Sequence, residues 1–98
     1  MRLKPNATPE FTKTLETKVL PLLRKQPGFK DEITCLIPGG NEVLALTMWE
    51  KKEHVDNYAR DIYPQVTKSL ETIVDGAFQV KTFEVASSTF HKIGAGLN

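Results

Sequence analysis

The sequence has very little cysteine, no long apolar run and almost no net charge. Cys35 is the only cysteine among 98 residues, so neither an internal disulfide nor a cysteine-based zinc cluster can form. Basic and acidic residues number 13 and 12, which leaves no electrostatic footprint for a nucleic acid or an anionic membrane. No apolar run reaches the length of a membrane span, and the first residues lack the apolar segment of a signal peptide. These absences favour a cytoplasmic protein without nucleic-acid or membrane partners.

Motifs of common chemistry are missing as well. The sequence has no Ser-His-Asp set, no metal-ligand cluster and no phosphate loop, and Gly39-Gly40 is a turn pair too short to cradle phosphate. The remaining composition, 40% hydrophobic and 26% charged, is ordinary for a globular protein. We expect one domain over residues 1–85, stabilised by oligomerisation because it is small, and no metal or cofactor. Residues 86–98 form either a loose tail or a dimer arm.

The stretch from Gly39 to Glu50 reads as a turn followed by a strand that is apolar on both faces. One face takes Val43, Ala45, Thr47 and Trp49, and the other takes Leu44, Leu46 and Met48. A strand of this kind should be covered on both faces. Two helices can cover only one face of a small sheet, so a second copy of the chain is the simplest cover for the other.

Two stretches have helical periodicity. The first starts at Thr8, a predicted N-cap, and ends at Gln26-Pro27-Gly28. Pro21 lies inside it and removes one backbone hydrogen bond, which predicts a bent helix held by packing. Its apolar face consists of Phe11, Leu15, Val19, Leu22 and Leu23.

The second helical stretch opens at Lys51 and stops at Asp75-Gly76. Pro64 interrupts it, which predicts either one kinked helix or two pieces that share one apolar face. Its apolar positions are Val55, Ala59, Ile62, Val66, Leu70 and Ile73.

Four strands complete the pattern: a short one at residues 2–4, Asp31–Ile37, the central 43–49, and Ala77–Val85. The order is strand, helix, strand, strand, helix, strand. This is the ferredoxin-like split β-α-β arrangement, an α+β fold with both helices on one face of an antiparallel sheet. Two such sheets packed through their helix-free faces make a dimeric α+β barrel, so we expect a homodimer.

Two motifs resemble those of a known family. Val19–Leu23 is followed by the turn Gln26-Pro27-Gly28-Phe29, and Leu46–Glu53 runs from a strand through tryptophan into a charged helix start. With these motifs the chain resembles the antibiotic biosynthesis monooxygenase-like family of dimeric α+β barrels, over roughly residues 2–85. The resemblance implies a homodimer with a cavity between helices and sheet. Activities in that family include cofactor-free oxygenation of aromatic polyketides, haem degradation and quinone oxidation.

Five residues are candidates for lining such a pocket, and no catalytic residue is assigned. By the resemblance, Trp49 flanks a planar ligand; otherwise it is a core or interface aromatic. Tyr58 and Tyr63 are either phenol donors in an apolar pocket or edge tyrosines with hydroxyls in water. Thr34 and Thr47 present hydroxyls to the cavity or are ordinary strand residues.

The remaining reactive side chains predict little chemistry. The haem-degrading branch needs a histidine on the second helix, but this helix has only His54, in its first turn, which we predict to be a surface residue. Cys35 is expected to be an inert buried thiol, and His91 lies in the tail. Two functions stay open. One is a cofactor-independent monooxygenase acting on a small aromatic or quinol-type ligand, and the other is a non-catalytic homodimeric module that binds a small ligand or stabilises an assembly.

Overall fold

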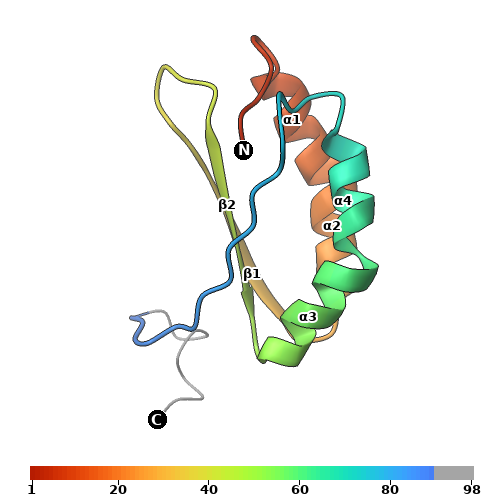
Figure 1. Ribbon diagram of the computed structural model, residues 1–98, viewed down its shortest axis with the longest axis vertical. Helices are drawn as coiled ribbons and strands as arrows, with labels where there is room; N and C mark the ends of the chain where they lie inside the picture. Colours follow the sequence, from red (N-terminus) through yellow and green to blue (C-terminus); the bar gives the residue numbers. More distant parts are fainter. Residues whose placement is uncertain (90–98) are drawn as a thin grey trace.

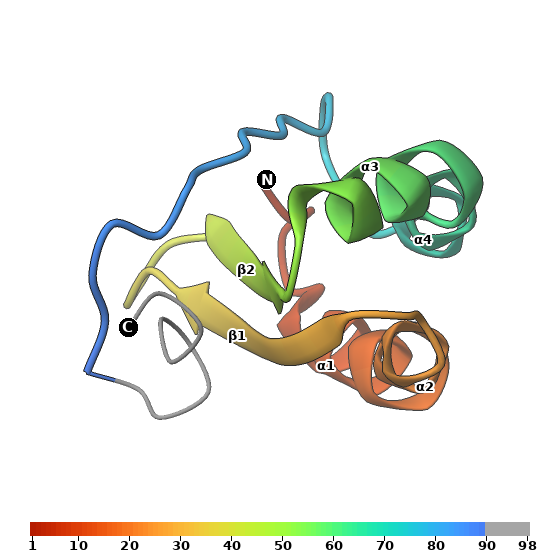
Figure 2. The same ribbon diagram turned by 90° about the horizontal axis from the view of Figure 1, so that it is seen from below.

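The computed structural model describes residues 1–89, which form two layers: a small antiparallel sheet and a layer of helices against one of its faces (Figure 1). Viewed from below, both helical stretches lie on the same side of the strands (Figure 2). The chain therefore has the predicted α+β character. In chain order the elements are α1 (Thr8–Thr14), η1 (Leu15–Val19), α2 (Leu20–Arg24), β1 (Phe29–Leu36), β2 (Val43–Trp49), α3 (Lys52–Asp61) and α4 (Tyr63–Leu70).

The first helical stretch passes through Pro21 by way of a π-helical turn. In η1 the backbone widens, and the N–H of Leu20 donates to the carbonyl of Leu15, five residues earlier. Pro21 has no N–H and its ring crowds the carbonyl of Thr17, so a wider turn relieves the clash. The helix continues through Pro21 as predicted. The predicted Thr8 cap is wrong, because Ala7 occupies the cap position and Thr8 is already helical.

Pro64 divides the second helical stretch into α3 and α4, so the alternative of two pieces holds. Ile62 lies between them with φ −114°, and Pro64 sits near the start of α4, where its missing N–H breaks no intrahelical bond. Val66 and Leu70 of α4 are buried, whereas Ala59, predicted on the apolar face, is exposed. The core contact of this stretch therefore comes mainly from α4.

β1 and β2 form the predicted antiparallel hairpin. The register runs from Leu36 opposite Val43 to Phe29 opposite Trp49, with an irregularity after Phe29. β1 starts and ends slightly earlier than the predicted Asp31–Ile37. This register places Glu32 directly opposite Thr47, a pairing that matters for the site.

The N-terminal residues pair with β2 and extend the sheet, at the place of the predicted short strand. The amino group of Met1 donates to the Val43 carbonyl at 2.8 Å, and the Val43 N–H donates to the Met1 carbonyl at 2.8 Å. On its other side, Arg2 accepts a bond from Asp75 at 2.7 Å, and Leu3 bridges Val74 in antiparallel orientation. The backbone order across the sheet is thus β1, β2, the N-terminal residues, then residues 73–75.

The predicted strand Ala77–Val85 is wrong for the single chain. Within residues 1–89 this segment joins no ladder, and apart from half-buried Phe78 residues 77–89 are exposed. Gly76, with φ +92°, turns the chain away from the sheet directly after Asp75. The segment starts beside the second helical stretch, curves past the strands and then runs on the side away from the helices (Figure 2). A strand needs a neighbour for its backbone groups, and the sequence alternation alone supplies none.

The buried core lies among the helices and the N-terminal residues, and among residues 1–89 only Val43 joins it from the hairpin. The helix-free face of the hairpin is bare: Leu44 is 59% exposed, and Ile33 and Leu46 are also exposed. The helix-facing side of β2 is itself covered only in part, because Val43 is buried while Ala45 and Thr47 are exposed. The core residues are Leu3, Ala7, Phe11, Val19, Leu23, Val43, Val66, Leu70, Ile73 and Val74.

Candidate functional site

The candidate aromatic residues form a continuous row between β2 and the second helical stretch. The ring centroids of Trp49 and Tyr58 are 4.8 Å apart, and those of Tyr58 and Tyr63 are 5.9 Å apart. Phe29, not singled out from the sequence, extends the row with its ring edge-on to Trp49 at 5.5 Å. All four side chains are half-buried. The row therefore offers aromatic surface without being closed off from solvent.

Each candidate threonine hydrogen-bonds a neighbour on its own strand, and the partner of Thr34 is a carboxylate that sequence reasoning missed. Thr34 Oγ1 donates a hydrogen bond to Glu32 Oε2 at 2.5 Å, and Trp49 Nε1 donates to Thr47 Oγ1 at 2.8 Å. Because Glu32 faces Thr47 across the hairpin, these four residues occupy neighbouring positions on the helix-facing side of the sheet. Alternation along β1 was the available signal, since Glu32 lies two residues before Thr34 and so shares its face.

Burial perturbs the titration of the acidic groups here. Burial raises the pKa of Glu32, and the hydrogen bond from Thr34 partly opposes that rise. Burial also raises the pKa of Tyr58, with smaller contributions from neighbouring Tyr63 and from Glu32. The pKa of Tyr63 is raised by burial alone. Burial therefore favours the neutral, hydrogen-bond-donating form of both phenols and the protonated form of one carboxyl group.

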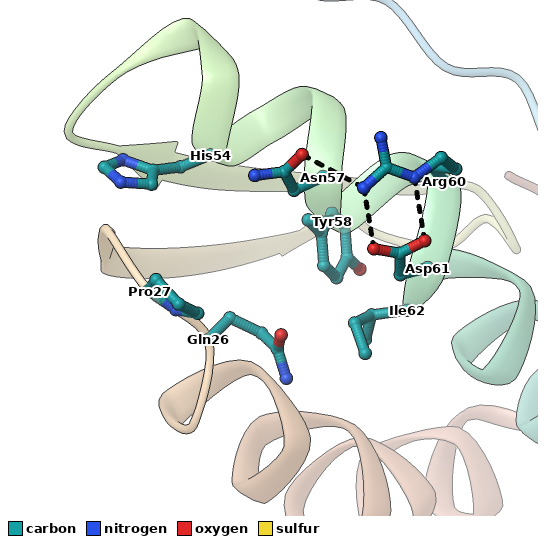
Figure 3. A pocket seen from close by; sticks show the side chains of 8 residues that line it. All are labelled: Gln26, Pro27, His54, Asn57, Tyr58, Arg60, Asp61 and Ile62. Atoms are coloured by element: carbon teal, nitrogen blue, oxygen red, sulfur yellow. Dashed lines mark hydrogen bonds and ion pairs between the residues drawn. The ribbon is translucent and has the colours of Figure 1, made fainter.

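A first open cavity, about 280 Å³, lies between the end of α2 and α3. Figure 3 shows His54 at one end and the exposed pair of Arg60 and Asp61 at the other, with Tyr58 between them. Arg60 donates to Asp61 at 2.8 Å and to Asn57 at 3.2 Å. The hydrogen bond from Arg60 holds the pKa of Asp61 below its usual range. This rim is polar and its charges are already paired.

A second open cavity, about 310 Å³, lies between α2 and β1. It is lined by Leu20, Arg24, Phe29, Lys30, Asp31 and Glu32. Glu32 thus belongs both to this cavity and, through its neighbours Thr34 and Tyr58, to the row of candidate residues. Of the five residues expected from the sequence, Tyr58 lines the first of these two cavities, and the other four line neither.

His54 packs against the turn that precedes β1, so its predicted place on the surface is wrong. The side chain is half-buried, and its Nδ1 is buried with no hydrogen-bond partner among residues 1–89. A Cβ atom at Gly28 would lie 2.0 Å from this Nδ1, and Gly28 has φ +77°. The Pro27-Gly28 turn therefore requires glycine both for its backbone conformation and for the imidazole. The spacing of four residues to Tyr58 was the signal that His54 faces inward.

Cys35 lies on the helix-free face of the hairpin and is exposed, so the predicted buried thiol is wrong. In the single chain, no described residues cover the face of the hairpin that carries Cys35. In the described part of the chain, no cluster of three or more His, Cys, Asp or Glu side chains is placed to hold a metal ion. None of the helices within residues 1–89 has the length and apolar character needed to cross a bilayer. His91 lies outside the described residues.

No protein-family model, curated protein or solved structure matches the chain significantly.

Proposed function

We propose that the chain binds a small aromatic molecule of phenol or quinol type between its helices and its sheet, and that it catalyses oxidation of this molecule by dioxygen without a cofactor. The observation that carries the proposal is the row formed by Trp49, Tyr58 and Tyr63 beside the Glu32–Thr34 pair. Small-molecule sites typically combine apolar aromatic walls with a few placed polar groups. The resemblance to the antibiotic biosynthesis monooxygenase-like family supports the same reading.

In such a reaction the substrate supplies the electrons. A quinol gives two electrons and two protons to dioxygen, and the products are a quinone and hydrogen peroxide. A phenol instead takes one oxygen atom into its ring to become a quinone, and the second oxygen atom leaves as water. The protein's part is to orient the ring against the aromatic row and to hold protons on nearby oxygens. Tyr58 and Tyr63, with raised pKa values, suit the donation of hydrogen bonds to a substrate oxygen.

Binding and turnover can be tested separately. Trp49 is the only tryptophan, so its fluorescence reports on the proposed site without labelling. Titration with hydroquinone and 1,4-dihydroxynaphthalene should quench it saturably, and an oxygen electrode should show uptake that scales with protein concentration. Tyr58→Phe keeps the ring row and removes one donor, so it should slow uptake while leaving quenching nearly unchanged. Absence of saturable quenching by either compound would contradict the proposal.

A non-catalytic binding module is the second candidate, and one observation favours it. Trp49 Nε1 donates to Thr47, and the Thr34 hydroxyl donates to Glu32. Both donors are therefore paired within the chain and do not point to a ligand. Saturable quenching without protein-dependent oxygen uptake would select this candidate over the enzyme.

We also propose that the sheet follows the ferredoxin-like order and that two chains pack as a dimeric α+β barrel. The bridges of Arg2 to Glu42 and of Leu3 to Val74 support the order, because they place the N-terminal residues between β2 and residues 73–75, which precede the segment predicted as the last strand. The exposed apolar row of Ile33, Leu44 and Leu46 supports the second copy as cover. The exposed thiol of Cys35 also suits a reducing compartment such as the cytoplasm.

Sedimentation at micromolar concentration should show a dimer. A stable dimer of this kind needs an interface above about 1,000 Å². Leu44→Lys places a charge on the bare face at a position 59% exposed in the single chain, so it should dissociate the dimer without unfolding the chain. Lys13→Leu on the exposed side of α1 is the matched control and should leave the mass unchanged. A wild-type monomer would contradict the assembly.

A further inference from the structure

The cavity between α2 and β1 combines three kinds of side chain that together suit one ligand class. Leu20 and Phe29 supply apolar walls, Glu32 and Asp31 supply carboxyl groups, and Arg24 and Lys30 supply two cationic groups. Its volume, about 310 Å³, exceeds the roughly 150 Å³ that accommodates benzene in an engineered protein cavity. One aromatic ring with its substituents therefore fits.

We infer that this cavity binds the hydroxylated end of a phenol-type ligand, with the carboxylate of Glu32 accepting the hydrogen of the ligand hydroxyl. The inference rests on the proposed function for the ligand type, and it adds the position of the ring and the residue that takes the proton. Glu32 is fixed for this role because Thr34 Oγ1 holds Oε2 at 2.5 Å. Among residues 1–89 the other carboxylate oxygen, Oε1, accepts no side-chain hydrogen bond and can accept one from the ligand.

The proton transfer balances without any further reactant. The ligand O–H bond breaks, a new O–H bond forms on Glu32 Oε1, and the ligand becomes a phenolate. The negative charge moves from the carboxylate to the ligand oxygen, so the cavity's net charge does not change. Arg24 and Lys30, which line the same cavity as Asp31, then attract the anionic ligand. A phenolate is also the electron-rich form that dioxygen oxidises in the proposed reaction.

Several charged or titratable groups lie near Glu32, and each can change how ligand binding depends on pH. Arg24 faces it from α2, and Tyr58 and Tyr63 lie on the second helical stretch. Lys30 and Asp31 are neighbours on β1. Burial, which raises the pKa of Glu32, means that the group gives up its carboxylate form at a higher pH than a solvated glutamate.

A matched pair of probes isolates the hydroxyl. The probes are 4-bromophenol and 4-bromoanisole, which have the same ring and bromine, but only the first has a hydrogen to donate. Calorimetry would give the dissociation constants. Quenching of Trp49 fluorescence by bromine would locate the ring, because Phe29 both lines the cavity and packs against Trp49. The wild-type chain should bind the phenol at least about tenfold more tightly than the ether, a typical margin for a charge-assisted hydrogen bond. This preference should fade as pH falls and Glu32 takes up a proton.

Glu32→Gln keeps the volume and can still accept from Thr34, so it should reduce the preference to below about threefold and remove its pH dependence. Glu10→Gln, an exposed glutamate on α1, is the control and should change nothing. Circular dichroism would establish that both variants are folded. If both probes bind and Glu32→Gln keeps the wild-type preference, the role of Glu32 is wrong while aromatic binding stands. If neither probe binds the wild-type chain, this inference and the proposed function fall together.

Discussion

Replacing Gly28 with alanine should weaken the fold by an amount that the structure allows us to divide into two parts. Gly28 has φ +77°, a conformation that costs an L-residue about 1–2 kcal/mol. The new Cβ would also lie 2.0 Å from His54 Nδ1, so the imidazole must leave its position. Moving that side chain off its rotamer costs about 0.5–1.5 kcal/mol more. We expect a total near 2–3 kcal/mol, or about 10–20 °C in melting temperature for a chain of this size.

Two further variants separate the contributions. Gly39 also has positive φ, at +74°, but nothing lies within 4 Å of a Cβ placed there, so Gly39→Ala should show the backbone cost alone. His54→Ala combined with Gly28→Ala removes the clash and should recover the difference between the two glycine variants. Urea denaturation followed by circular dichroism would give each free energy of unfolding. A Gly28→Ala protein as stable as wild type, or a double variant without recovery, would refute the packing described for His54.

Three other predictions concern the site. Trp49→Ala should lower the free energy of unfolding by about 2 kcal/mol, less than the 3–5 kcal/mol of a fully buried aromatic, because Trp49 is half-buried. Trp49→Phe should lower it by under about 1 kcal/mol. Chemical denaturation would measure both, and a Trp49→Ala protein as stable as wild type would contradict the structural role. Folding raises the pKa of Glu32, so the folded chain binds the proton more tightly than the unfolded chain does. Wild type should therefore gain stability relative to Glu32→Gln as pH falls from about 8 to about 4. The opposite slope in denaturation midpoints would refute the burial of Glu32. Haemin should give no saturable Soret shift, because the one histidine of α3 packs its Nδ1 against Gly28; a shift lost in His54→Ala would contradict this.

The elements that the sequence predicted well are those whose pattern is local. Helical periodicity located both helical stretches, and the Pro38–Asn41 turn located the hairpin, because each depends on residues a few positions apart. The π-helical turn was not predictable from pattern, since the period of apolar residues runs unbroken through Pro21. The strand Ala77–Val85 failed for a different reason. Alternation shows that a segment can pair, but a ladder also needs a free edge in reach.

The candidate site was predicted only in part, because its members are defined by pairing across elements. Trp49, Tyr58 and Tyr63 were found from motif and helix position, and the structure joins them in one row. Glu32 was missed because a strand glutamate usually marks a solvated position. Alternation with Thr34 placed Glu32 on the same face, and the hairpin register, which sets Glu32 opposite Thr47, shows that it belongs with the candidates.

The bare face of the hairpin and the extended segment after Gly76 have a common physical consequence. Leu44 on that face is 59% exposed and Phe83 in the segment is 77% exposed, so one chain leaves two apolar surfaces in water. A second copy related by a two-fold axis would present the same two surfaces, and each chain could cover the other's. The proposed ligand site lies on the opposite, helix-facing side, which such packing leaves open. Dimer formation and ligand binding are therefore separable, and a monomeric Leu44→Lys protein that still binds 4-bromophenol would show that the aromatic row and Glu32 suffice without the partner.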